Sequence, residues 1–383
     1  MFKPAYLFLV VLISGAFNLS AQPINFESLR EQYLQPSDKW PKPFLDPGIA
    51  HHEIGLLPAI TFPESNPFSV AKMRLGEALF HDPILSSSKH IACASCHDRD
   101  LGWADGREVS FGHNRRFGKR NAPSIENAAL WETLFWDGRA SSLEQQALMP
   151  IQDSNEMNFR LFELGLRLNI NAYYKSKFNE VFGKNIIEVS DVAKALATFQ
   201  RTIRSRNADF DYFMHAITQE DPKKKDFYAK KLSDQALWGM HLFRTKARCM
   251  NCHSGALFSD NKFHNIGLTY YKREYEDLGL FNITGMPDDV GKFKTPSLRG
   301  VMNTKPWMHN GLFASMEGII NIYNAGGVRI PKDKNDVFFP ETSPILQPLL
   351  LTTEEMKALE AFLNAITAHP ARGPHFSFLS RSK

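Results

Sequence analysis

All four cysteines of this 383-residue chain lie in two copies of one pentapeptide, C-x-x-C-H. The first copy spans residues 93–97 (CASCH) and the second spans residues 249–253 (CMNCH). In this pentapeptide the two thiols can form thioethers with the vinyl groups of a haem, and the histidine can become an axial ligand of its iron. The sequence therefore predicts two covalently bound c-type haems. Their predicted attachment residues are Cys93, Cys96, Cys249 and Cys252, and their predicted iron ligands are His97 and His253.

The spacing disfavours other uses of these cysteines. Structural zinc sites place their C-x-x-C knuckles close together in sequence, whereas His97 and His253 are 156 residues apart. A thioredoxin-like redox motif would need a βαβ pattern, which neither copy has around it. An even number of cysteines in an exported chain invites a disulfide interpretation, but haem attachment would use all four sulfurs.

Residues 1–21 have the pattern of a signal peptide. Lys3 precedes an apolar stretch of 12 residues, Tyr6 to Phe17, which is too short to span a bilayer comfortably. A short membrane anchor is the alternative, because Leu19 is not the small residue that such a cleavage site prefers. We predict a chain exported to the periplasm, with no membrane span in its mature part.

Composition narrows the classes of function. The chain is 43% hydrophobic and 22% charged, which suits neither a disordered nor a collagen-like protein. Its 45 basic residues are dispersed among 41 acidic residues, giving a formal charge of +4. No nucleic-acid partner is therefore expected.

Helical patterns repeat around the two motifs. Ser69 is predicted to cap a helix that ends before Pro83, and Ser233 is predicted to cap a second helix. Each of these helices precedes its C-x-x-C-H motif by a short loop. Further amphipathic helices are predicted over 190–204 and 353–366. The predicted fold is mainly α, with two cytochrome c-like helical domains, each around one covalently bound c-type haem.

The chain is accordingly divided into five parts. They are a signal peptide (1–21), a Pro-rich arm laid over the surface (22–68), an N-terminal, peroxidatic haem domain (69–218), a C-terminal, electron-transfer haem domain (219–372) and a flexible tail (373–383). The charged stretch at 219–231, near the domain boundary, is interpreted as a solvated linker or as a docking site for an acidic electron donor.

Eight further motifs identify a family that the chain resembles. They are L-G-E-A-L-F-H-D-P at 75–83, G-H at 112–113, R-N-A-P at 120–123, F-W-D-G-R-A at 135–140, E-M at 156–157, F-H-N at 263–265, K-T-P-S-L-R at 294–299 and M-H-N-G at 308–311. In this order and spacing they resemble the bacterial di-haem cytochrome c peroxidase and MauG superfamily, over nearly the whole mature length. The resemblance implies that peroxide reacts at the N-terminal haem and that the C-terminal haem transfers electrons.

The resemblance also implies roles for residues around the N-terminal haem. His113 matches a distal histidine that leaves the iron before peroxide binds. Glu156 matches the acid–base residue, which the chemistry needs because heterolytic cleavage of the O–O bond moves a proton between the peroxide oxygens. Trp136 matches an aromatic residue between the haems, an expected path for electrons. The alternatives are an ordinary loop histidine, a surface glutamate and a core tryptophan.

At the C-terminal haem the chain departs from the peroxidase pattern. The peroxidases have a methionine 14 residues after the histidine matched by His309, whereas this chain has Tyr323, the MauG-type residue. A tyrosinate ligand favours Fe(III) and lowers the potential relative to a thioether. The alternative is that Tyr323 only packs on its helix, and that no residue or one of three methionines binds the iron: Met302, Met308 or Met316.

The resemblance further implies one Ca²⁺ between the domains. Its ligands would be the side-chain oxygen of Asn121 and the main-chain carbonyls of Thr304 and Pro306. Water would complete the six to eight oxygen ligands that calcium takes. The alternative is that Thr304 and Pro306 simply form a turn.

Three functions follow from these observations. The first is a periplasmic di-haem peroxidase that reduces hydrogen peroxide to water with electrons from a small redox protein, a c-type cytochrome or a cupredoxin. The second is a MauG-type oxidase that uses peroxide to oxidise Tyr or Trp of a partner protein. The third is a non-enzymatic di-haem electron carrier. Homodimers are frequent in this family, so a homodimer is a further expectation.

Overall fold

The computed structural model describes residues 24–369, so the predicted signal peptide and the tail at 373–383 lie outside the described residues. Twelve α-helices and one two-stranded sheet are found within 24–369, which confirms the mainly α prediction. The helices are α1 (Phe26–Tyr33), α2 (Val70–His81), α3 (Leu143–Gln152), α4 (Leu161–Ile170), α5 (Ala172–Phe182), α6 (Val189–Thr202), α7 (Asp209–Ile217), α8 (Pro222–Ala229), α9 (Asp234–Arg244), α10 (Phe281–Thr284), α11 (Met316–Asn324) and α12 (Thr353–Ala365). Strand β1 (Phe263–His264) pairs antiparallel with β2 (Phe293–Lys294). None of the helices in the described part is both long and apolar enough to cross a bilayer.

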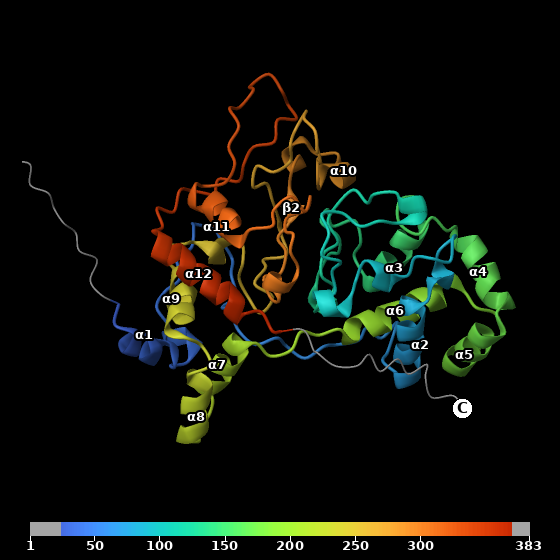
Figure 1. Ribbon diagram of the computed structural model, residues 1–383, viewed down its shortest axis with the longest axis horizontal. Coiled ribbons are helices and arrows are strands. Elements are labelled where there is room, and N and C mark those ends of the chain that lie inside the picture. The colour runs from blue at the N-terminus through green and yellow to red at the C-terminus, as the bar shows by residue number, and fades with distance from the viewer. Residues whose placement is uncertain (1–23, 370–383) are drawn as a thin grey trace, which may run out of the picture.

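Two hydrophobic cores organise these elements. Helices α2 to α6 build the first core, against which Cys93 packs. Helices α1, α7, α9, α11 and α12 build the second core, against which Cys249 packs. Figure 1 shows the first group on the right and the second on the left, with β2 and α10 between them. Each core therefore carries one C-x-x-C-H motif.

The local signals in the sequence predict several helix boundaries correctly. The Ser69 hydroxyl accepts a hydrogen bond from the Lys72 amide at the start of α2, and α2 ends before Pro83. The Ser233 hydroxyl caps α9 in the same way. The helices predicted over 190–204 and 353–366 are α6 and α12.

One helix crossing is repeated in the two cores. A Cβ atom placed on Gly76 of α2 would lie 2.0 Å from the carbonyl oxygen of Ala195 in α6. A Cβ atom on Gly239 of α9 would lie 1.9 Å from the carbonyl oxygen of Ala358 in α12. Such distances are far below van der Waals contact, so only glycine permits each pair of backbones to meet. The helix that precedes each C-x-x-C-H motif is thereby fixed against a partner helix.

The N-terminal arm differs from the expectation that it lies over the surface. Tyr33, Trp40 and Ile54 are buried in the second core. The buried Arg244 of α9 donates a hydrogen bond to the Tyr33 hydroxyl and forms an ion pair with Glu53. The Pro-rich composition concealed this burial, because the apolar residues of the arm are few and follow no regular period. Part of the arm is thus a structural element of the second core.

Helix α7 packs on the second core, although it precedes the predicted domain boundary at 218/219. Its Phe210 and Phe213 are completely buried there. This packing would place the boundary before Asp209, and the division into domains stays a prediction. The lysine-rich stretch forms α8, which Asp221 caps through its carboxylate. Its role as a linker or a docking site is likewise still a prediction.

Replacing the glycine at either helix crossing should destabilise the protein. Gly76→Ala and Gly239→Ala each force the two backbones apart, and overpacking of this kind costs about 1–3 kcal/mol. Gly165→Ala in α4 is the matched control, because the nearest atom to its Cβ would be 3.9 Å away. Differential scanning calorimetry should show lower melting temperatures for the first two variants only. A control that melts as early as they do would contradict the crossing as the cause.

Glu126 reaches from the first half of the chain to the second. A Cβ atom on Gly300 would lie 3.0 Å from its carboxylate oxygen. Among residues 24–369 this carboxylate has no hydrogen bond or ion pair, and burial raises the pKa of Glu126 from 4.5 to about 7. When folding raises the pKa of an acid, the folded protein keeps its full stability at pH values below the pKa of the unfolded state. It loses stability as the pH rises toward the pKa of the folded state.

Glu126→Gln should therefore raise the melting temperature more at about pH 8 than at about pH 5, because the amide carries no charge that burial can penalise. The measurement is thermal unfolding followed by far-UV circular dichroism, in the presence of a chelator so that no cation neutralises the carboxylate. Glu132→Gln, which removes an exposed carboxylate, is the control. An equal gain at both pH values would rule out ionisation of Glu126 as the cause.

Candidate active site

The first C-x-x-C-H motif forms a single 3₁₀ turn over Cys93–Ser95. The amide of His97 donates a hydrogen bond to the carbonyl oxygen of Cys93 at 3.1 Å, which closes the turn. The imidazole is held by a bond of 3.0 Å between its Nδ1 and the carbonyl oxygen of Trp103. Because this bond uses Nδ1, it leaves Nε2 free to bind a metal, and burial lowers the pKa of His97 and so favours the neutral ring.

The second motif repeats this arrangement. Its 3₁₀ turn spans Cys249–Asn251, and the amide of His253 donates to the carbonyl oxygen of Cys249 at 2.8 Å. Nδ1 of His253 lies 2.8 Å from the carbonyl oxygen of Phe258. Burial lowers the pKa of this imidazole as well. Each turn thus offers two unpaired thiols and one oriented, neutral imidazole, and this set of donors fits a c-type haem.

One large cavity connects the two motifs. It has a volume of about 1210 Å³, and its lining includes Cys96 and His97 from the first turn and Cys249, Cys252 and His253 from the second. Pockets for a single small molecule usually have about 300–1,000 Å³. The size of the cavity and its two attachment turns are therefore consistent with more than one cofactor.

Glu156 lies on the side of the cavity that the first turn lines. It follows α3, and its main-chain carbonyl accepts a hydrogen bond of 2.6 Å from the amide of His113. Burial, with a smaller contribution from Asp153, raises the pKa of Glu156 to about 7. The carboxyl also acts electrostatically on Cys93 and Cys96. A carboxyl group whose pKa lies near neutrality can both take and return a proton in this place.

The loop that carries His113 approaches Glu156 closely. A Cβ atom on Gly112 would lie 2.0 Å from the carbonyl oxygen of Asn155, so the G-H motif requires glycine there. Gly112 lines the cavity, whereas His113 is not among the lining residues. Nδ1 of His113 instead lies 3.1 Å from the hydroxyl of Ser87. Ligation of iron by His113 stays a prediction.

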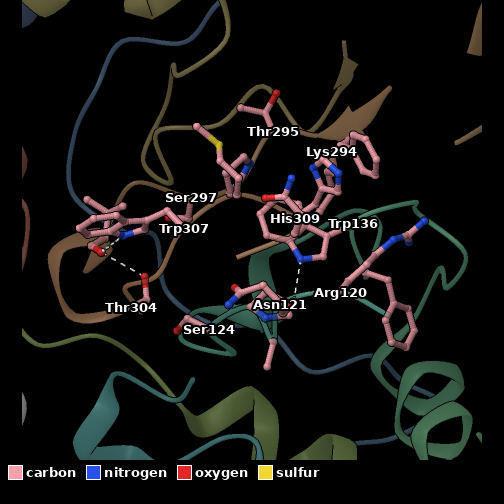
Figure 2. Close-up of a pocket in the computed structure, with 18 of the residues that line it drawn as sticks. Arg120, Asn121, Ser124, Trp136, Lys294, Thr295, Ser297, Thr304, Trp307 and His309 are labelled. Carbon is pink, nitrogen blue, oxygen red and sulfur yellow. Dashed lines mark hydrogen bonds between the residues drawn. The ribbon is translucent and has the colours of Figure 1, made fainter. Parts of the chain in front are cut away.

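Trp136 lies in the wall of the cavity that both motifs line. Its indole N–H donates a hydrogen bond to the carbonyl oxygen of Asn121 at 3.0 Å, drawn as a dashed line below Trp136 in Figure 2. Its ring meets that of His309 edge to face, with the centroids 6.4 Å apart. Next to Trp136, Asp137 forms an ion pair with Arg120. Arg120 also forms an ion pair with Asp277 of the second half. Ion pairs between the halves therefore fix the surroundings of the indole.

Two of the three residues predicted to bind calcium also line this cavity. The amide nitrogen of Asn121 donates to the carbonyl oxygen of Arg107 at 2.8 Å, so the side-chain oxygen is directed elsewhere. Thr304 lines the cavity too, and Pro306 follows it after one residue. Figure 2 labels Asn121 and Thr304 among the residues that line the cavity. The calcium site stays a prediction.

Tyr323 lies in α11 and lines the cavity on the side of the second turn. Burial, followed by the electrostatic influence of Cys252 and Cys249, raises the pKa of its hydroxyl. Of the three methionines considered as alternative ligands, Met308 and Met316 line the cavity, and Met302 does not. Tyr323 is therefore placed to face a group attached to the second turn, and its ligation stays a prediction.

Sequence reasoning missed Gln146. This residue of α3 lines the cavity with Glu156, and its side-chain oxygen is buried without a hydrogen-bond partner among the described residues. A buried acceptor without a partner is costly, so it marks a place where a polar molecule can bind. In sequence Gln146 looks like an ordinary polar helix residue, and no local pattern could have identified it.

Comparisons with known proteins agree with this arrangement. A family model described as di-haem cytochrome c peroxidase matches residues 70–219. The chain is 33% identical to cytochrome-c peroxidase IdrP1 of Pseudomonas sp. (strain SCT) over 345 residues, 83% of this chain and 86% of that protein. It is 38% identical to the methylamine utilization protein MauG of Methylorubrum extorquens over 319 residues, 82% of this chain and 83% of that protein.

A solved structure shows the same fold. It is the crystal structure of a MauG-like protein associated with microbial copper homeostasis, with a TM-score of 0.70 and 31% sequence identity. The match covers 82% of this chain and 95% of that chain. Family membership implies two c-type haems and oxidoreductase activity, in keeping with the two attachment turns. The chain belongs to the di-haem cytochrome c peroxidase and MauG family.

Proposed function

We propose that the protein is a periplasmic di-haem peroxidase that reduces hydrogen peroxide at the haem attached through Cys93 and Cys96. The buried carboxyl of Glu156, beside this attachment turn in the cavity, carries the proposal. The electrons would come from a small redox protein, a c-type cytochrome or a cupredoxin. Each peroxide takes up two electrons and two protons and becomes two molecules of water.

The residues around the first turn perform the proton transfer. The haem, when bound, supplies an iron centre at which peroxide is activated and through which electrons pass. Glu156 takes a proton from one peroxide oxygen and returns it to the other, which leaves as water. The partnerless side-chain oxygen of Gln146 accepts a hydrogen bond from peroxide and holds it beside Glu156. Electrons would pass between the two haem sites by way of Trp136.

A second candidate function is favoured by Tyr323. Its buried hydroxyl, close to Cys249 and Cys252, supports the proposal that it binds the iron of the second haem. A tyrosinate ligand would give that haem a low potential, unsuited to ordinary electron uptake from cytochrome c. In a MauG-type reaction, peroxide would take its two electrons from Tyr or Trp side chains of a partner protein. A simple electron carrier would need neither Glu156 nor Gln146 in an accessible cavity.

Calcium between the two halves is proposed as a structural ion. Asn121 would contribute its side-chain oxygen, and Thr304 and Pro306 their carbonyls, with water supplying the remaining ligands. Because Trp136 donates its hydrogen bond to the carbonyl of Asn121, the ion would also fix the position of the indole.

Glu156→Gln should lower kcat/KM for hydrogen peroxide by about 10²–10⁴-fold, because the amide cannot take up the proton. The measurement is steady-state consumption of peroxide with reduced cytochrome c as the electron donor, and again without it. Glu132→Gln removes a carboxyl that is exposed and outside the cavity, and should leave the rate unchanged. A wild-type rate in Glu156→Gln would remove this residue from the reaction. Peroxide consumption that needs a partner protein instead of cytochrome c would favour the MauG-type function.

Tyr323→Met should raise the reduction potential of one haem and change its absorption spectrum, because a thioether stabilises Fe(II) better than a phenolate does. Spectroelectrochemical titration of the holoprotein measures both effects. Tyr173→Met, at a half-exposed position of α5, is the control and should change neither. If the spectrum of Tyr323→Met matches that of the wild type, Tyr323 is not an iron ligand.

A further inference from the structure

Lys294 is a buried cation in the wall of the cavity. It belongs to β2, and its main-chain amide donates a hydrogen bond of 2.8 Å to the carbonyl oxygen of Trp136. Its side-chain nitrogen lies 3.2 Å from the centre of the Trp131 ring. Lysine is almost never fully buried without a partner, yet only 8% of this residue is exposed.

The other cations of the cavity wall differ from Lys294 in their partners. Every arginine that lines the cavity forms an ion pair with a carboxylate: Arg120 with Asp137 and Asp277, Arg139 with Asp137, Arg248 with Asp46, and Arg299 with Asp211. Lys119, the other lining lysine, is exposed. Lys294 has no carboxylate partner within residues 24–369, and the Trp131 ring is its one side-chain contact of a polar or cation–π kind there.

A cation–π contact does not compensate for burying this charge. The free energy gained from such a contact is smaller than the free energy that the burial of an unpaired ammonium costs. Burial accordingly lowers the pKa of Lys294 to about 7. An anion that enters the cavity would remove this penalty.

The lining of the same cavity contains two more polar groups without hydrogen-bond partners among the described residues. Nε2 of His309 and the side-chain nitrogen of Asn310 are buried and make no hydrogen bond with any described residue. The His309 ring stacks on Phe293, the neighbour of Lys294, with the centroids 3.6 Å apart. Figure 2 shows Lys294, His309 and Trp136 on the same part of the cavity wall. His309 and Asn310 thus add polar atoms without partners to the cavity wall that Lys294 also lines.

We propose that Lys294 forms an ion pair with a propionate carboxylate of a haem in this cavity. The wall has carboxylates of its own, but none of those in the described residues pairs with Lys294, and a haem would bring further carboxylates into the cavity. Lys294 is then a positioning residue, which links a haem edge to Trp136 through the backbone of β2. The proposal rests on the two haems of the family and not on the peroxidase function, so either can fail without the other.

The ion pair has a measurable electrostatic consequence. A positive charge beside a haem stabilises its reduced form, so loss of that charge lowers the reduction potential. In holoprotein carrying Lys294→Met, the potential of one haem should fall by the equivalent of about a tenfold change in the reduction equilibrium, or about 59 mV for one electron. Lys294→Arg keeps the charge and should retain the wild-type potential.

Lys292→Met is the matched control. Lys292 lies two positions before Lys294, is partly exposed and pairs with Asp289. Both haem potentials should stay at their wild-type values in this variant. Equal potentials in Lys294→Met and Lys292→Met would overturn the proposal. A fall in Lys294→Arg as large as that in Lys294→Met would also overturn it, because the loss would then not follow the charge.

A spectroscopic measurement tests the contact itself. Haem labelled with ¹³C at its propionate carboxyl groups gives carboxylate bands that are identified in reduced-minus-oxidised infrared difference spectra. One labelled band should shift in Lys294→Met and stay in place in Lys292→Met. Labelled bands that are identical in the wild type and Lys294→Met would show that no propionate pairs with this lysine.

Discussion

The close contact of two helix backbones determines where each haem can be attached. Gly76 and Gly239 bring α2 and α9 against the carbonyl groups of α6 and α12, at distances that no side chain would allow. This contact fixes each helix, and so also the position of the C-x-x-C-H turn that follows it. Both histidines then use Nδ1 for a main-chain carbonyl and direct Nε2 to the same cavity. The two halves therefore orient their imidazole rings by the same hydrogen bond to the main chain.

The same symmetry makes the differences between the halves informative. The buried carboxyl group beside the first turn, Glu156, forms no ion pair among the described residues and shares the cavity with the unpaired acceptor of Gln146. The buried carboxylate beside the second turn, Asp260, is paired with His264 instead. A buried phenol, Tyr323, lies beside the second turn. A carboxyl near neutrality suits proton transfer, whereas a phenol suits an anionic ligand for oxidised iron. The attachment turns are thus alike, whereas the ionisable groups beside them differ.

Sequence reasoning succeeded where the determining interaction is local. The pentapeptides and the caps at Ser69 and Ser233 act within a few residues, so their consequences could be predicted. The arm was misjudged because the burial of Tyr33 and Trp40 depends on Arg244, about 200 residues away in the chain. Gln146 was missed for the same reason, since an unpaired acceptor exists only after the fold has closed around it.

The charges of the cavity wall complete this description. The ion pair of Arg120 with Asp277 joins the first half of the chain to the second. The other arginines of the wall are paired with carboxylates as well. Among the buried cations that line the cavity in the described residues, Lys294 is the one without a carboxylate partner from the polypeptide. A buried ammonium without an anion would weaken the fold by several kcal/mol, unless the cofactor supplies the missing charge. On this proposal the haem carboxylates help to balance the charges of the cavity wall. They would contribute to the stability of the fold, as the haem iron contributes to the reaction.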